Sequence, residues 1–586
     1  MFRSFSIGED KRERLFLATL LLMSLALRIV NFVLNRNNPL MHHPINDEAF
    51  YIGWANFIRD GHWMGDASVF FMDPLYAYFL AMLFSFFGEN LDLIKLTQIL
   101  ADSLNSVLIY FIGKKIFSRQ TGEIASIIYC LYKVSFFYTL LILKPILALS
   151  FALLAIYMLL TAKETPLRWI CIGIIVGLSS ILRANNSLLV LLIPTGIMLI
   201  HRDRFAVNLK KIGLFLLGAS IILLTSGARN YFKGGEFILL TSQMGRALYI
   251  SNNPDNMSGM CIIPSFARWD PYNLEIDFHR EAERRNNKIM TSREVSQYWR
   301  SQTLKFILSE PGKGLKILWN KLRLTYQDAE IPNNYSFDFS KRFSYILKLP
   351  LPTFAIILGL GIPGIILSYK KHPLSIWLLL FGMVPMATIF MFYTSSRFRF
   401  SLAPLLILFS GYTLWWIKNN LSKLKWIGIL SILAGSILIT GSSIYFREPT
   451  FDAHGYFLTA KAYKAKGLYG KANKEIDEGI KLAPRMALYW DMKGLILMEI
   501  NTGIMAEKMF RKALSLDAKY SEAWYNLGII YYKRGAHLEA VKNLKKAISL
   551  KGFPKYYLAL SQAYSSMGKQ DLAEKYYRIY QQTKIK

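Results

Sequence analysis

The sequence predicts an all-α protein in which a polytopic membrane helical bundle is followed by a soluble α-solenoid. Three observations predict this fold. Apolar blocks of about 20 residues recur from Leu15 to Phe446, and each can span the ~30 Å hydrocarbon layer of a membrane. After Phe446 the composition becomes that of a soluble protein, with a 34-residue period. The chain is also strongly basic, and much of its positive charge lies in short loops between the apolar blocks.

The composition excludes several classes of protein. With 53% hydrophobic residues and a mean hydropathy of +0.27, the chain of 586 residues is neither disordered nor fibrous. Its net charge of +31 would indicate a nucleic-acid partner in a soluble protein, but membrane topology accounts for it here, and we expect no nucleic-acid partner. Cys130, Cys171 and Cys261 lie far apart in the chain, so neither a disulfide framework nor a cysteine metal site is expected.

The first apolar block begins the predicted bundle. Lys11, Arg12 and Arg14 precede it, and no small-residue cleavage site follows, so we expect an uncleaved first span with a cytosolic N-terminus. We expect eleven spans in all, at about 15–34, 94–112, 121–140, 143–160, 168–183, 186–200, 209–226, 350–369, 374–394, 400–417 and 425–446. This topology predicts a multi-pass protein of the cytoplasmic (inner) membrane in contact with membrane lipid.

The block Pro74–Gly88 decides the orientation of every later loop. It has 15 residues, and reading it as a span would invert those loops. Reading it as an interfacial or re-entrant helix follows the positive-inside rule, because five basic segments then lie in the cytosol. These segments are Lys114/Lys115/Arg119, Lys163/Arg168, His201–Arg204 with Lys210/Lys211, Lys370/Lys371, and Lys418/Lys423/Lys425.

The same topology divides the chain into four parts. Residues 1–226 form an N-terminal membrane module whose first outward loop is 35–92, and residues 227–349 form a large outward, periplasmic loop. Residues 350–446 hold the C-terminal spans, and residues 453–586 form a repeat domain on the outer side of the membrane.

The repeat domain shows its period directly. Trp490, Gly494 and Ala506 recur 34 residues later as Trp524, Gly528 and Ala540, and further copies begin near 453 and 557. Small residues at these places let paired helices touch, while aromatic residues fill the space between them. The segment resembles four tetratricopeptide repeats, which implies that it binds a partner protein or a protein acceptor.

The first outward loop holds the residues that suggest chemistry. Asp47-Glu48 lies about a dozen residues beyond the first span, after His42 and His43, and Asp73-Pro74 closes the loop. Each feature also has a purely structural interpretation: Asp47 as a helix N-cap and Asp73 as part of a turn. Their common position near the membrane face favours a functional site.

Several motifs in order resemble the GT-C membrane glycosyltransferases, in the bacterial branch with protein O-mannosyltransferases and aminoarabinose transferases. They cover about residues 15–420. They are Arg28 in the first span, Asp47-Glu48, Pro74-Leu75-Tyr76 with Phe87-Gly88-Glu89, Gln98, Arg229-Asn230-Tyr231, Tyr249–Pro254, and Arg397-Phe398-Arg399 followed by Pro404.

The resemblance implies an inverting transfer of a sugar from a polyprenyl-phosphate donor to a protein, glycan or lipid acceptor at the outer face. Asp47 matches the position of the family's general base. Glu48 would support it, and Asp73 lies near the second acidic position. Donor phosphate would be held by a set of cations, Arg397, Arg399, Lys144 and Arg28.

Metal dependence is left open. A metal would be held by Asp47, Asp73 and His43. Many relatives, however, carry an acid at the start of the fourth span, where this chain has Lys144, which can hold phosphate but binds no metal.

Three other functions remain as alternatives. A transporter would place charges near mid-membrane and show a repeated half, and neither feature is visible in the sequence. An O-antigen ligase or polymerase would carry its long outward loop late and lack the early Asp-Glu loop. A non-catalytic scaffold displaying the repeats would not need Asp47.

Overall fold

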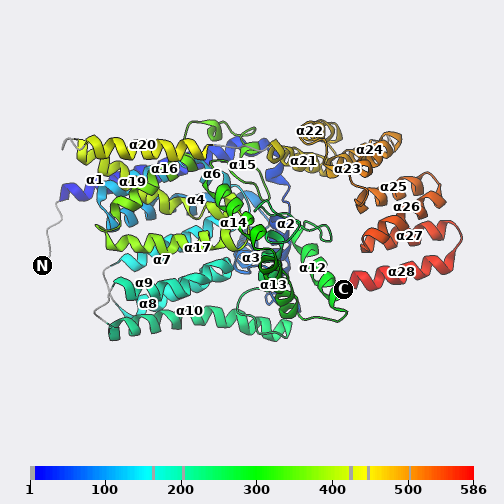
Figure 1. Ribbon diagram of the computed structural model, residues 1–586, viewed down its shortest axis with the longest axis horizontal. Coiled ribbons are helices and arrows are strands. Elements are labelled where there is room, and N and C mark those ends of the chain that lie inside the picture. Colours follow the sequence, from blue (N-terminus) through cyan, green and yellow to red (C-terminus); the bar gives the residue numbers. More distant parts are fainter. Residues whose placement is uncertain are drawn as a thin grey trace. The chain divides into compact units, whose positions relative to one another are not determined.

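The computed structural model describes residues 7–161, 165–200, 205–421, 426–444, 449–500 and 503–585. Over these ranges the chain is helical, as predicted, and β-type pairing is limited to one isolated bridge between Asn253 and Asn256. Two compact units are separated at residue 446, namely Met1–Phe446 and Arg447–Lys586 (Figure 1).

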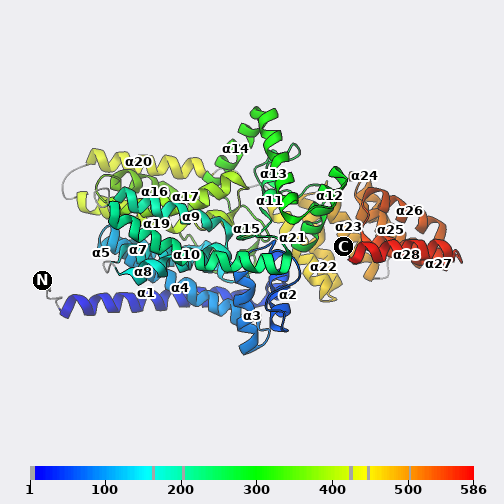
Figure 2. The same ribbon diagram turned by 90° about the horizontal axis from the view of Figure 1, so that it is seen from below.

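Membrane-type helices form most of the first unit. Among the described residues, five segments are long and apolar enough to cross a membrane: Lys11–Asn37, Leu91–Ile116, Phe205–Gly234, Pro373–Met391 and Trp426–Ser443. They contain helices α1 (Ile7–Leu34), α4 (Leu91–Ile116), α10 (Phe205–Gly234), α17 (Ile376–Met391) and α20 (Trp426–Ser443). Helices α1, α10 and α20 run along a common direction in both views (Figures 1 and 2). A membrane bundle is thus supported, while the count of eleven spans is not confirmed and stays a prediction.

The remaining apolar helices are shorter than a span requires. They are α3 (Leu75–Phe87), α7 (Pro145–Leu160), α8 (Pro166–Leu182), the continuous pair η3 (Ala184–Leu188) and α9 (Leu189–Ile200), and α16 (Phe354–Ser368). Helix α19 (Ala403–Leu421) has 19 residues and is preceded by the single turn α18 (Ser396–Arg399).

The predicted span at about 121–140 does not form one helix. The chain makes α5 (Arg119–Cys130) and then α6 (Lys133–Thr139), with a break at Leu131 and Tyr132. At 1.5 Å per residue, each is too short to cross a hydrocarbon core. Among the basic segments used for the topology, Lys163, His201–Arg204, Lys423 and Lys425 lie outside the described residues.

Backbone contact joins α8 to α10. A Cβ on Gly173 would lie 2.0 Å from the carbonyl oxygen of Phe215, and one on Gly218 would lie 2.1 Å from that of Ile170. Only glycine allows two helices to approach this closely, as is common where membrane helices cross.

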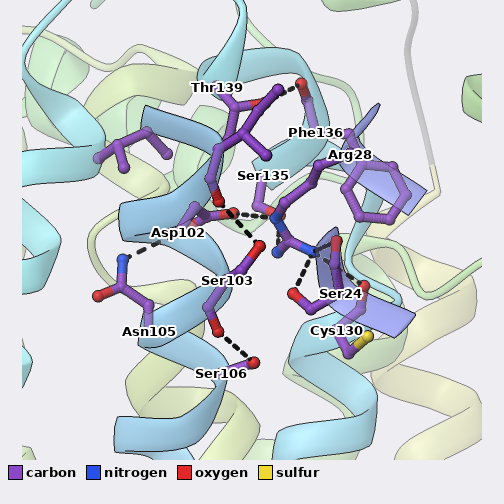
Figure 3. A network of polar contacts seen from close by, with 12 residues as sticks. Ser24, Arg28, Asp102, Ser103, Asn105, Ser106, Cys130, Ser135, Phe136 and Thr139 are labelled. Atoms are coloured by element: carbon purple, nitrogen blue, oxygen red, sulfur yellow. Dashed lines mark hydrogen bonds and ion pairs between the residues drawn. The ribbon is translucent and has the colours of Figure 1, made fainter. Parts of the chain in front are cut away.

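A buried ion pair ties the first helix to the bundle. The guanidinium of Arg28 in α1 donates to Asp102 of α4 at 2.6 Å, to Ser24 Oγ at 2.7 Å and to Ser135 Oγ of α6 at 2.8 Å (Figure 3). Tyr129 of α5 also donates to Asp102. Both charged side chains of the pair are fully buried. The pair therefore links four helices through charges that no solvent reaches.

Shorter elements connect the membrane-type helices. Before α3 they are η1 (Asn35–Asn37), η2 (Pro39–His42) and α2 (Asp47–Arg59), and between α10 and α16 they are α11 (Met244–Ser251), α12 (Pro271–Asn286), α13 (Ser292–Ser309), α14 (Pro311–Tyr326), α15 (Phe337–Ser340) and η4 (Tyr345–Lys348). The turn η5 (Pro373–Ser375) directly precedes α17. Trp299 centres a small core between α11, α12 and α13 and donates its indole N–H to the carbonyl of Phe278 at 3.0 Å.

The second unit consists of antiparallel helix pairs. They are α21 (Pro449–Ala465) with α22 (Tyr469–Leu482), α23 (Ala487–Glu499) with α24 (Gly503–Leu516), α25 (Ser521–Lys533) with α26 (His537–Leu550), and α27 (Pro554–Ser566) with α28 (Gln570–Ile585). A Cβ at Gly494 or Gly528 would collide with Phe510 or Leu544 of the paired helix. The small positions of the predicted 34-residue period therefore mark helix contacts.

Loss of Asp102 should unfold the first unit more readily than loss of a surface acid. Asp102→Ala leaves Arg28 buried without its counter-charge, which costs about 3–5 kcal/mol. In Glu123→Ala, the control, a half-exposed pair with Arg119 is lost, worth about 0.5 kcal/mol. Thermal unfolding in detergent compares the two, and similar melting temperatures for both variants would contradict a central role for the Arg28–Asp102 pair.

Candidate functional site

Two cavities share one wall at an end of the helical bundle. The larger, of about 400 Å³, is lined by polar and apolar side chains, and the smaller, of about 120 Å³, is mainly polar where it meets the wall. Both cavities are lined by Lys144, Gln243, Ala247, Tyr393 and Arg397. Lys144 and Arg397 are therefore accessible from both cavities.

The larger cavity is lined by a group of charged side chains and by apolar side chains. Its charged lining residues are Asp73, Lys144, Arg183 and Arg397. Its apolar lining includes Leu188, Leu191, Leu240, Met244, Val384, Ala387, Met391 and Phe392. The side chains of Leu191, Met244 and Met391 are also well exposed, so the apolar part reaches the surface of the unit. This arrangement suits an amphiphile with an anionic head and a hydrocarbon tail.

Asp47 lines the smaller cavity as the first residue of α2. Two acids in the first turn are favourable there, because a helix N-terminus carries partial positive charge. The carboxylate of Asp47 forms an ion pair with Arg397 at 2.6 Å, and both side chains are mostly buried. The sequence-based candidates Asp47 and Arg397, which are 350 positions apart, are thereby brought together.

Asp73 and Lys144 form the second ion pair of the site, and both line the larger cavity. The amide N–H of Ala184 donates to the other carboxylate oxygen of Asp73 at 3.1 Å, and Lys144 also donates to the hydroxyl of Tyr51 at 3.1 Å. Lys144 directly precedes α7, and Ala184 follows α8, so this pair fixes the loop before α3 against two helices of the bundle.

Glu48 supports the site from behind. Its carboxylate accepts from the amide of Ile142 at 2.8 Å and from the hydroxyl of Tyr335, and it lines neither cavity. Burial raises the pKa of Glu48 to about 7, although these two hydrogen bonds favour the charged form. Glu48 thus connects α2 to the segment before Lys144 and to the 227–349 region.

Arg399 and Arg28 are not brought to the cavities. Arg399 is 1% exposed and is held by Glu330 at 2.8 Å and by the carbonyl of Ala329 at 2.9 Å. Arg28 is enclosed by its pair with Asp102. Charges this deeply buried need partners within the protein. Here Glu330 pairs with Arg399 and Asp102 pairs with Arg28. The geometry thus favours structural roles for both, in place of the predicted contact with donor phosphate.

Arg183 is the main cavity residue that the sequence reasoning missed. It follows α8 directly, donates to Ser401 Oγ at 3.0 Å and to the carbonyl of Arg397 at 3.5 Å, and stacks on the ring of Phe398. These partners are neutral, so they leave its charge uncompensated. The signal that could have found it is the one used for Arg397: a cation at the predicted outer end of a span.

Polar residues of the smaller cavity were also missed. Arg246, Trp269, Asn333 and Asn334 line it, and all come from the 227–349 region. Arg246 pairs with Glu275 at 2.6 Å. The amide nitrogen of Asn334 is buried without a hydrogen-bond partner in the described part of the chain, so it can donate to a bound group.

The residues present do not fit a divalent-metal site. Asp47 and Asp73 are each engaged by a cationic side chain, and His43 lines neither cavity. Within the described ranges, no group of three or more His, Cys, Asp or Glu side chains is placed to hold a metal ion.

Comparison with known families supports both parts of the predicted architecture. Residues 72–227 match the family model described as dolichyl-phosphate-mannose-protein mannosyltransferase, a range that includes Asp73, Lys144 and Arg183. Residues 509–542 and 554–578 match tetratricopeptide-repeat models. The predicted combination of a mannosyltransferase-like membrane segment with tetratricopeptide repeats is confirmed at this level.

Individual proteins match over shorter stretches. The human protein O-mannosyl-transferase TMTC3 is 31% identical over 91 residues, which are 15% of this chain and 10% of the relative, so the chain spans only about a tenth of that protein's length. Among solved structures, a MamA protein (23% identity, TM-score 0.21) covers 28% of this chain and 87% of its own. The protein TTC0263 of Thermus thermophilus (18%, TM-score 0.22) covers 28% and 91%.

The family matches divide along the chain in the same way as the two compact units of the structure. The mannosyltransferase match lies wholly inside the first unit, and both repeat matches lie inside the second. The chain is thus similar to membrane mannosyltransferases over 72–227 and to tetratricopeptide-repeat proteins over the matched part of its C-terminal unit.

Proposed function

We propose that this protein is a membrane glycosyltransferase that moves a sugar from a polyprenyl-phosphate donor to an acceptor hydroxyl on the outer face of the membrane. One observation carries the proposal: a cavity with a cationic end and an apolar wall adjoins a cavity that holds a carboxylate. The similarity of residues 72–227 to mannosyltransferases supports the same reaction class.

Charge balance supports a phosphate at the cationic end. Lys144 is neutralised by Asp73 and Arg397 by Asp47, whereas the partners of Arg183 are neutral. The cluster therefore carries about one excess positive charge, which matches the single negative charge of a phosphodiester. The apolar wall, from Leu188 to Met391, would take the first part of the polyprenyl chain.

The second cavity would hold the acceptor. The acceptor hydroxyl loses its proton to Asp47 while its oxygen attacks the anomeric carbon, and the bond from that carbon to the phosphate oxygen breaks. The electron pair leaves on the phosphate, where Lys144, Arg183 and Arg397 stabilise the growing charge. Attack from the side opposite the leaving group inverts the anomeric centre.

Arg397 would couple donor binding to activation of the base. Its ion pair with Asp47 occupies the carboxylate that would act as the base. A donor phosphate that competes for Arg397 would release Asp47 next to the acceptor. The carboxylate would then be available to the acceptor hydroxyl only when the donor is bound.

The repeats would present a protein acceptor or dock a partner. The C-terminal unit is basic, since residues 447–586 hold 25 Lys+Arg against 13 Asp+Glu. An acidic partner surface is therefore favoured. Repeat arrays of this kind bind extended segments along the surface formed by stacked helices.

Asp47→Asn should lower sugar transfer by about 10²–10⁴-fold while expression stays normal, because the amide keeps size and polarity but accepts no proton. Transfer from a polyprenyl-phosphate mannose in proteoliposomes measures this. Asp60→Asn, an exposed acid at the end of the same helix, is the control and should be silent. Equal activity of the two variants would exclude Asp47 as the base, and no transfer by the unmodified protein would favour a scaffold or another glycan reaction.

Arg183→Met should raise the KM for donor and lower kcat by about 10²-fold, because its charge stabilises the leaving phosphate more than the bound donor. Lys144→Met should act in the same direction. Arg59→Met, a partly exposed arginine of α2, serves as the control. A change confined to the KM of the acceptor would show that Arg183 does not contact the phosphate.

The repeat unit should lie outside the cell membrane. Eleven spans that start from a cytosolic N-terminus end on the outer face. External protease added to intact spheroplasts should therefore remove residues 453–586, while a cytosolic marker protein stays intact. Full protection of the repeats would mean that one span is miscounted, with the broken segment 121–140 or the short block Pro74–Gly88 as the source.

A further inference from the structure

Helix α14 places apolar side chains on the face that points away from the protein. Its buried face consists of Gly314, Ile317, Lys321 and Leu324. The opposite face carries Leu315 (67% exposed), Leu318 (42%), Trp319 (65%) and Leu322 (42%). A helix on the surface of a soluble domain shows polar residues outward, so α14 is not patterned for water.

The end of α13 extends this surface. Leu304 and Leu308 are 52% and 78% exposed, and Leu304 lines one hollow together with Leu315 and Leu318 of α14. The apolar hairpin face is defined here as Leu304, Leu308, Leu315, Leu318, Trp319 and Leu322. Single exposed leucines are common on protein surfaces, but six apolar side chains on two adjacent helices indicate a surface that contacts an apolar environment.

The face is continuous with a membrane-type helix. α14 packs on α17, and a hollow of about 380 Å³ is lined by Leu304, Leu315 and Leu318 on one side and by Phe390 and Met391 on the other. Met391 ends α17 and is itself 43% exposed. In Figure 2, α13 and α14 project from the bundle on the side opposite α2 and α3. The hairpin thus lies beside the end of a candidate span.

Basic side chains surround the apolar hairpin face. Arg300, Lys305, Lys313, Lys316 and Arg323 are exposed on the same two helices. From Arg300 to Arg323 the sequence holds one acid, Glu310, which pairs with Lys313. An apolar stripe with a tryptophan and flanking cations is the pattern of helices that lie in the interface of an anionic membrane.

We infer that the α13–α14 hairpin is a membrane anchor, lying in the outer leaflet with its apolar face among acyl chains and its cations against anionic headgroups. This inference goes beyond the proposed function, since it needs no enzymatic activity. It also gives the 227–349 region a second contact with the membrane besides the spans that flank it.

Spin labels on single cysteines test the depth of the hairpin. Cys171 and Cys261 are replaced by alanine, and a label is placed at Leu318→Cys, at Leu322→Cys or, as control, at Ile289→Cys, an exposed apolar residue (88%) outside the hairpin. The full chain is reconstituted in phosphatidylcholine vesicles that contain phosphatidylglycerol. Labels at 318 and 322 should collide with oxygen and lose collisions with a soluble nickel chelate, whereas the label at 289 should keep them.

Two results would overturn the inference. Nickel collisions at 318 and 322 equal to those at 289 would place the face in water. Loss of both oxygen and nickel collisions would show that protein covers it.

The headgroup contact has its own test. Lys305→Ala with Lys316→Ala should make the label at 322 shallower in vesicles with phosphatidylglycerol, and should have no effect in phosphatidylcholine alone. Lys288→Ala, an exposed lysine outside the hairpin, is the control. An unchanged depth in the double variant would contradict the preference for anionic headgroups.

Discussion

The ion pair between Asp47 and Arg397 is the contact on which the arrangement of the site depends. It joins the first outward loop to the segment after α17, and Arg397 lies in the wall that both cavities share. The Lys144–Asp73 pair fixes the same loop from the other side. Because buried charges are tolerated only with partners, the two pairs specify which segments must meet at this end of the bundle. Both cavities lie between the segments that the Asp47–Arg397 and Asp73–Lys144 pairs hold together.

Sequence reasoning found the acids of the site more readily than its cations. Asp47 and Asp73 both belong to the predicted loop 35–92, and each lines one of the two cavities. Among the cations, Arg397 and Lys144 reach the cavities, whereas Arg399 and Arg28 are taken up by Glu330 and Asp102. Arg397 and Arg399 are two residues apart and carry the same signal in the sequence. Both lie in the single turn α18, which directs the side chain of Arg397 to Asp47 and that of Arg399 to Glu330. The composition of the segment does not predict this difference.

Hydropathy predicted where apolar segments lie but not how they are divided into helices. A window over 121–140 averages across the break at Leu131, because the residues there are as apolar as their neighbours. The contact of α8 with α10 through Gly173 and Gly218 likewise leaves no trace in a hydropathy average. The 34-residue repeat was easier to recognise, because each copy is one helix pair and the same positions recur in several copies.

The shared wall has a thermodynamic consequence. Any ligand that draws Arg397 away from Asp47 changes the affinity of the neighbouring cavity, and that coupling must be equal in both directions. Under the proposed reaction, the phosphate changes from a diester with one negative charge to a monoester with nearly two. The cluster of Lys144, Arg183 and Arg397 would then hold the spent lipid carrier more tightly than the donor. The same cations that stabilise the leaving phosphate would therefore also slow departure of the carrier.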